Sequence, residues 1–170
     1  LVSFLNEYFS EMSKIIFENK GTLNKFIGDG ILSFWGAPIY ISDHAYFACK
    51  SALEMQRRLT ILRNNWIKQN KPEIKIRIGI NSGNMIIGNV GGMKRFDYTI
   101  MGDNVNIASR LENANKEYKS RILISESTYE LVKEKFITRE LDLIIVKGKT
   151  KPLRIYELIG FINDPISEEK

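Results

Sequence analysis

The sequence has one cysteine, one histidine, four prolines and no long hydrophobic run. Cys49 cannot form an internal disulfide, and His44 has no second histidine with which to build a metal pair. The longest apolar stretches are too short to span a membrane, and no signal-peptide pattern opens the sequence. The absence of repeats and low-complexity tracts excludes solenoids and flexible linkers. We therefore expect an intracellular protein in a reducing compartment.

With 170 residues, 44% of them hydrophobic, the chain can bury the core of one domain. We assign this domain to residues 1–160 and a C-terminal tail to residues 161–170. The formal net charge of +5 suits an anionic ligand. Basic residues are mixed with acidic ones and no basic stripe is interleaved with aromatics, so we expect no nucleic-acid partner.

Hydrophobic periodicity predicts mixed secondary structure. Helices are expected over residues 1–19, from Ser42 or Asp43 onward, from Asp103 onward, and from a cap at Ser125 or Ser127 to about Phe136. Strands are expected in a hairpin over 21–36, over 74–80, 85–90, 97–101 and 121–125, and on both sides of a Lys-Gly-Lys turn at 147–149. This order predicts an α+β sandwich with helices on a largely antiparallel sheet.

The segment FDYTIMGDNVNIASR (96–110) reads as a strand that turns at Gly102 into a helix. Asp103 is expected to accept hydrogen bonds from the first N–H groups of the helix. Asn106 and Arg110 are four residues apart and therefore share one helix face. An amide one turn from a planar cation, near a helix N-terminus, suits phosphate and sugar hydroxyls. The alternative interpretation is a solvated helix face.

The triplet Gly28-Asp29-Gly30 between two apolar runs predicts a tight hairpin, because glycine tolerates the positive φ of such turns. A carboxylate at a hairpin tip can bind Mg²⁺, which prefers oxygen ligands and shares them with phosphates. Asp29 can equally be present only for the turn.

Four segments in this order closely resemble the class III adenylate/guanylate cyclase catalytic domain: KFIGD (25–29), GINSG (79–83), the 96–110 segment and VKGKTKPLRIYE (146–157). The resemblance covers nearly the whole chain and is greatest to the bacterial and soluble adenylate cyclase subgroup. It implies a ferredoxin-like fold derived from βαββαβ. It also implies a head-to-tail homodimer with nucleotide bound at the interface.

The resemblance further implies a role for each matching residue. Asp29 corresponds to a metal-binding carboxylate, Lys25 and Thr99 to the base-reading pair, Asn106 to the ribose-orienting residue, Arg110 to the transition-state cation, and Lys147, with Lys149 as fallback, to the polyphosphate lysine. The cofactors implied are two Mg²⁺ or Mn²⁺ ions, which would promote attack of the ribose 3′-oxygen on the α-phosphorus of ATP.

The residue types at the base-reading positions favour ATP over GTP. The Lys25 ammonium can donate to N1 of adenine, and the Thr99 hydroxyl can accept from the 6-amino group. Guanine reverses both groups, so it would leave Lys25 facing a donor. Guanylate cyclases resemble this pattern but carry Glu at the Lys25 position.

One part of the family pattern is absent. In the family, the first strand supplies the other metal-binding Asp, whereas no Asp precedes Asp29 in this sequence. Glu7, Glu11 and Glu18 do not match the motif. We expect an N-terminally truncated domain that lacks this strand and is weakly active or inactive by itself. We expect a cytoplasmic location, compatible with an upstream sensor or membrane domain in a longer parent protein.

Two alternative functions fit parts of the sequence pattern. A diguanylate cyclase has a related palm fold, but its Gly-Gly-Asp-Glu-Phe hairpin is absent. A degenerate cyclase-like domain, used for dimerisation or nucleotide sensing, would explain the missing Asp. It would not explain why Lys25, Asp29, Asn106 and Arg110 occur together.

Overall fold

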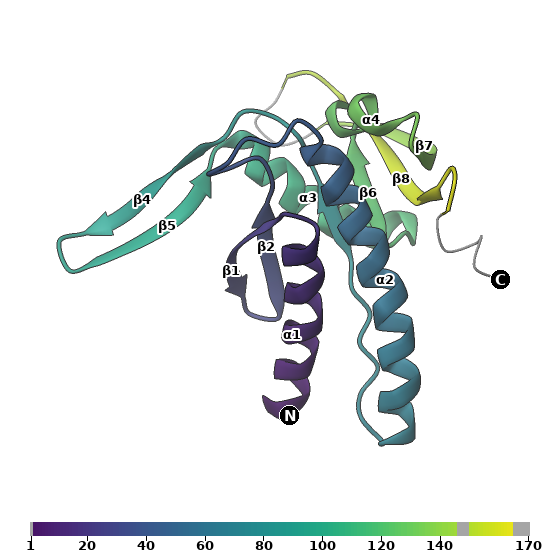
Figure 1. The fold of residues 1–170 in the computed structure, drawn as a ribbon. Coiled ribbons are helices and arrows are strands. Elements are labelled where there is room, and N and C mark those ends of the chain that lie inside the picture. The colour runs from purple at the N-terminus through teal and green to yellow at the C-terminus, as the bar shows by residue number, and fades with distance from the viewer. Residues whose placement is uncertain (1, 146–149, 165–170) are drawn as a thin grey trace. The chain divides into compact units, whose positions relative to one another are not determined.

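The computed structural model describes residues 2–145 and 150–164, with Phe96 described by its backbone only (Figure 1). The chain forms two compact units that join in sequence between Ile76 and Arg77. Among the described helices, none is both long enough and apolar enough to cross a membrane.

The first unit consists of α1 (Val2–Glu18), the strands β1 (Thr22–Ile27) and β2 (Gly30–Phe34), and the long helix α2 (His44–Lys68). α1 buries the apolar stripe predicted for residues 1–19 and packs on α2. The rings of Phe4 and Trp66 meet edge to face with centroids 4.7 Å apart. Trp66 Nε1 also donates to Glu7 Oε2 at 3.1 Å. α2 begins one residue after Asp43 and buries Cys49 completely.

β1 and β2 form the predicted hairpin. They pair antiparallel, and Ile27 opposite Gly30 closes the ladder around the two-residue turn Gly28-Asp29. Gly28 has a φ of 60°, which a residue with a Cβ rarely adopts. The register shifts between Leu23 and Lys25, so the strand carries a bulge there.

The second unit is built on a four-stranded sheet in the order β3-β6-β8-β7. Its strands are β3 (Ile78–Ile80), β6 (Ile122–Ser125), β7 (Phe136–Ile144) and β8 (Leu153–Phe161). β8 pairs antiparallel with β6 and β7, whereas β3 runs parallel to β6. The strand predicted over 74–80 is thus shorter than expected. Its alternating burial extends back to Ile74, but ladder pairing to β6 begins only at Ile78.

Helix α3 (Asp103–Tyr118) covers one face of this sheet. Its buried residues Ile107 and Leu111 form a core cluster with Leu123 of β6 and Ile155 of β8. The prediction that Asp103 caps α3 is wrong. The N-cap is Gly102, at a φ of 124°, and no side-chain cap bond forms. Asp103 instead lies in the first turn, where its charge favours the positive end of the helix dipole.

Ser125 caps α4 (Glu126–Val132), because its hydroxyl accepts from the Thr128 amide at 3.4 Å. This settles the predicted choice between Ser125 and Ser127, and the helix ends at Val132, before the expected position. β4 (Ile86–Gly92) and β5 (Arg95–Met101) form a separate antiparallel hairpin that projects from the rest of the second unit (Figure 1).

Candidate active site

The β1–β2 hairpin carries two of the predicted site residues. The ladder pairs Lys25 with Leu32 and Phe26 with Ile31. The Phe26 ring packs against Phe9 of α1, with centroids 4.5 Å apart. Successive side chains of a strand point to opposite faces, so Lys25 points away from α1. Lys25 is exposed and available to a ligand on that face.

Asp29 is exposed at the tip of the same hairpin. Burial, together with the charge of Asp29, raises the pKa of Tyr8 to about 12. Within residues 2–145 and 150–164, no group of three or more His, Cys, Asp or Glu side chains could hold a metal ion. Asp29 can supply one carboxylate ligand, so the described residues do not form the two-metal site that the resemblance implies.

Thr99 lies in β5, opposite Gly88 of β4. Its side chain is buried, with 7% of its surface exposed. Its hydroxyl lies 3.4 Å from the Ile100 carbonyl, the distance of a long hydrogen bond in which Thr99 donates. A Cβ built on Gly88 would meet nothing within 4 Å, so the space beside Gly88 is open.

α3 brings Asn106 and Arg110 together on one face, as predicted. Asn106 is exposed and Arg110 is half-buried. Three contacts fix the helix on the sheet. Its first turn is bonded to Asn81 after β3, its middle lies directly over Gly79, and Asn115 Nδ2 donates to the Ile78 carbonyl at 3.0 Å. The pair is therefore presented by a rigid element rather than a loop.

The structure does not describe the two lysines predicted to bind the polyphosphate. Lys147 and Lys149 lie outside the described residues. Sequence reasoning missed the contact between Asn81 and Asn104, which joins the loop after β3 to the first turn of α3, although both residues lie within the recognised motifs. The available signal was their position, since one directly follows a strand and the other lies in the first turn of a helix.

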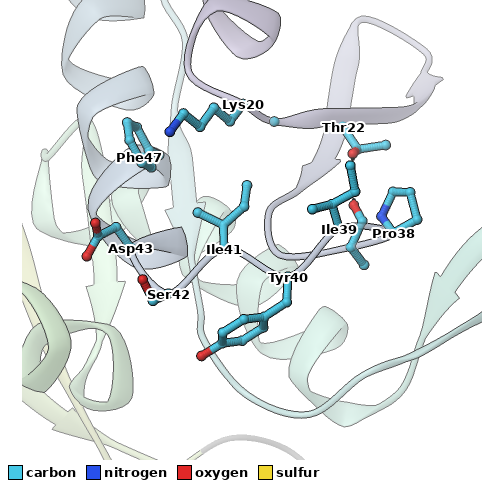
Figure 2. A pocket seen from close by; sticks show the side chains of 11 residues that line it. Lys20, Thr22, Pro38, Ile39, Tyr40, Ile41, Ser42, Asp43 and Phe47 are labelled. Atoms are coloured by element: carbon cyan, nitrogen blue, oxygen red, sulfur yellow. Dashed lines mark hydrogen bonds between the residues drawn. The ribbon is translucent and has the colours of Figure 1, made fainter.

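A pocket of about 620 Å³ lies in the first unit, between the start of the hairpin and the start of α2 (Figure 2). Lys20 Nζ points at the Phe47 ring, 4.7 Å from its centroid. Thr22 Oγ1 donates to the Ala37 carbonyl at 3.1 Å along the same wall. None of the predicted site residues lines this pocket.

Residues 1–160 match the family model of the adenylate and guanylate cyclase catalytic domain. Adenylate cyclase 1 from Rhizobium meliloti is 36% identical over 162 residues, which are 95% of this chain and 24% of that protein. The chain therefore spans about a quarter of the length of this relative.

Solved structures agree with this match. The adenylyl cyclase CyaB from P. aeruginosa superposes with a TM-score of 0.87 at 38% identity, over 96% of this chain and 84% of that one. The guanylate cyclase domain of RhGC from Catenaria anguillulae, solved in complex with GTP, superposes with a TM-score of 0.81 at 32% identity, over 94% and 84%. The α+β fold is thus that of the class III cyclases. The chain belongs to the adenylate and guanylate cyclase catalytic domain family.

Proposed function

We propose that this chain is an adenylate cyclase catalytic domain, which converts ATP to 3′,5′-cyclic AMP and pyrophosphate. The ribose 3′-oxygen would lose its proton and bond to the α-phosphorus, and the bond from that phosphorus to the pyrophosphate oxygen would break. The observation that carries the proposal is the position of Asn106 and Arg110, one turn apart on the anchored helix of a domain of this family.

Asn106 and Arg110, both on α3, have different proposed roles. Charge grows on the α-phosphoryl oxygens in the transition state, and the Arg110 guanidinium can stabilise it with paired donors. The Asn106 carboxamide can hold ribose hydroxyls so that the attack is in line. Because the Arg110 contact strengthens only as charge develops, its loss should reduce turnover more than nucleotide binding.

The base-reading pair supports ATP as the substrate. Thr99 is a residue type whose hydroxyl can accept from the 6-amino donor of adenine. The exposed Lys25 ammonium can donate to N1. The relatives include an adenylyl cyclase and a guanylate cyclase bound to GTP, so nucleotide choice is a property to be measured on this chain.

We also propose that the active unit is a homodimer. The β4–β5 hairpin is two-stranded, and a hairpin of this kind is marginal in water without further packing. It exposes large apolar side chains, among them Ile86, Val90, Met93 and Tyr98. A second copy of the chain that covers this hairpin would remove these side chains from water.

Divalent metal is part of the proposal, with Mg²⁺ or Mn²⁺ bound by Asp29 and the nucleotide phosphates. Asp29 supplies one carboxylate, and the described residues contain no cluster of three or more His, Cys, Asp or Glu side chains around it, so they fit a complete two-metal site poorly. For the same reason we propose that this chain converts ATP slowly.

The test is cyclic nucleotide production from Mn²⁺-ATP and from Mn²⁺-GTP, measured beside nucleotide affinity. Arg110→Ala should lower kcat by about 10²–10³-fold and change the Kd for ATP by less than about threefold. Lys116→Ala is the matched control, because Lys116 is an exposed cation in the last turn of the same helix. It should leave both quantities unchanged.

Three other outcomes would contradict the proposal. Preference for GTP would overturn the assignment of the base-reading pair. Equal kcat values for Arg110→Ala and Lys116→Ala would refute the role of Arg110. Tight nucleotide binding without any turnover would favour the alternative function, a degenerate domain that senses nucleotide or dimerises.

A further inference from the structure

The loop that follows β3 holds the first turn of α3. Asn81 Nδ2 donates to the backbone carbonyl of Asn104 at 2.9 Å and to its side-chain Oδ1 at 3.1 Å. The Asn104 Nδ2 in turn donates to the Asn84 carbonyl at 2.9 Å. The carboxamide of Asn104 is therefore bonded on both sides by residues 81–84. Asn106 lies two residues further along the helix and Arg110 six.

The orientation of the Asn81 amide follows from its partners. A backbone carbonyl can only accept, so the group that faces Asn104 must be the NH₂. The Asn81 Oδ1 then accepts from Ser125 Oγ at 2.6 Å and from Ser127 Oγ at 3.1 Å. One side chain thus joins the end of β3 to the start of α3 and to the cap of α4.

Gly83 provides the room for this arrangement. A Cβ at this position would overlap the Asn104 carboxamide, at 2.6 Å from its Cγ and 2.9 Å from its Oδ1. The carboxamide cannot swing aside without breaking the bonds to Asn81 and Asn84. Asn81, Gly83 and Asn84 together form a clamp on the first turn of α3, and we call them the α3 clamp.

We infer that Asn81 and Asn104 are positioning residues for the cyclase reaction, since the α3 clamp sets where α3 holds Asn106 and Arg110. This inference rests on the proposed function for its catalytic consequence. A shift of about 1 Å in reacting groups can cost about 10²-fold in rate. The clamp lies at the end of α3 nearest Asn106, so loosening the first turn would displace Asn106 directly.

The physical part of the inference is tested by hydrogen exchange, which needs no turnover. The amides of Val105 and Asn106 donate to the Gly102 carbonyl at 3.1 and 3.4 Å, so their exchange reports opening of the first turn. Asn81→Asp keeps the shape and the acceptors for the serines but faces Asn104 with oxygen. Asn113→Ala is the matched control, because it removes an exposed amide hydrogen bond to the Ser109 carbonyl within α3 but away from the first turn.

Exchange at Val105 and Asn106 should be at least about tenfold faster in Asn81→Asp than in wild type and unchanged in Asn113→Ala. Gly83→Ala is the second variant, which displaces the Asn104 carboxamide from a different direction and should give the same result. Equal exchange in all four proteins would overturn the inference.

The catalytic part is tested by steady-state kinetics with Mn²⁺-ATP. Asn81→Asp should lower kcat by about 10–100-fold with KM within about threefold. If Asn81 acts through Arg110, the loss should largely disappear when Asn81→Asp is added to Arg110→Ala. Full additivity, or an unchanged kcat, would overturn the catalytic part. A wild-type chain without turnover would overturn the proposed function and this part together, while exchange would still decide the anchoring.

Discussion

Replacement of Gly79 by alanine should move α3. The effect of this movement on kcat can be measured separately from its effect on the free energy of unfolding. Gly79 is the middle residue of β3 and pairs with Leu123 of β6. A Cβ built there would overlap the Ala108 carbonyl oxygen and the Glu112 amide nitrogen and would lie 2.9 Å from the Leu111 Cβ. The first two atoms are four residues apart, the spacing of one helical hydrogen bond.

The size of the expected displacement follows from these distances. Carbon atoms pack at about 3.5–4.0 Å, so the Leu111 Cβ must retreat by roughly 0.6–1 Å, and the carbonyl by more. Helix backbone cannot rotate away as the end of a side chain can, so α3 or β3 must shift as a whole. Overpacking of this kind typically destabilises by about 1–3 kcal/mol. A displacement of about 1 Å at Asn106 and Arg110 should lower kcat by about 10²-fold.

The assay combines urea denaturation with initial rates from Mn²⁺-ATP at saturating nucleotide. Gly160→Ala is the matched control, because Gly160 lies in β8 of the same sheet and a Cβ there meets nothing within 4 Å. We expect its free energy of unfolding to stay within about 0.5 kcal/mol of wild type. A Gly79→Ala protein with wild-type stability and wild-type kcat would refute the close approach of α3 to β3.

Three further predictions concern other parts of the chain. Ile86→Glu should shift the proposed dimer toward monomer in sedimentation analysis, because it places a charge on the exposed apolar hairpin; an unchanged mass would exclude that hairpin from the interface. Hydrogen bonding to Arg58 lowers the pKa of Glu11, so the pair stabilises the fold above the unfolded pKa and loses its effect as the pH falls through the folded one. Glu11→Gln should therefore lower the free energy of unfolding by about 0.5 kcal/mol at neutral pH, and the two proteins should converge in acid. The hydrogen bond to the Asp142 carboxylate, followed by burial, raises the pKa of Tyr118 to about 12, so Asp142→Asn should lower the pKa of one tyrosine, as followed by ultraviolet difference spectra.

The sequence was most informative where one local rule determined the structure. The Gly28-Asp29-Gly30 triplet predicted the β1–β2 turn, because positive φ at that point requires glycine. The spacing of Asn106 and Arg110 predicted their common face, because helical geometry leaves no alternative once α3 forms. Both features depend on fewer than ten consecutive residues.

Predictions failed where a distant partner decided the outcome. The alternating isoleucines before β3 read as a longer strand, but pairing depends on β6, which reaches only Ile78–Ile80. Asp103 has the residue type of a cap, yet Gly102 occupies the cap position and the first turn is held by Asn81 instead. Propensity cannot reveal a hydrogen bond from a residue 23 positions away.

The candidate site residues of the first unit and those of the second differ in how firmly their own unit holds them. Asn106 and Arg110 are carried by α3, which is fixed on its sheet by buried side chains and by hydrogen bonds at both ends. Lys25 and Asp29 are exposed on a two-stranded hairpin, which the Phe9–Phe26 contact joins to α1. Small hairpins with few buried side chains open at lower free energy than core helices. Arg110, which we propose meets the transition state, is therefore carried by the more rigid element, whereas Lys25 and Asp29, the proposed base and metal contacts, can adjust as nucleotide binds. Hydrogen exchange should show this difference as faster exchange in residues 22–34 than in the middle of α3, and ATP should slow exchange in the hairpin more than in the helix.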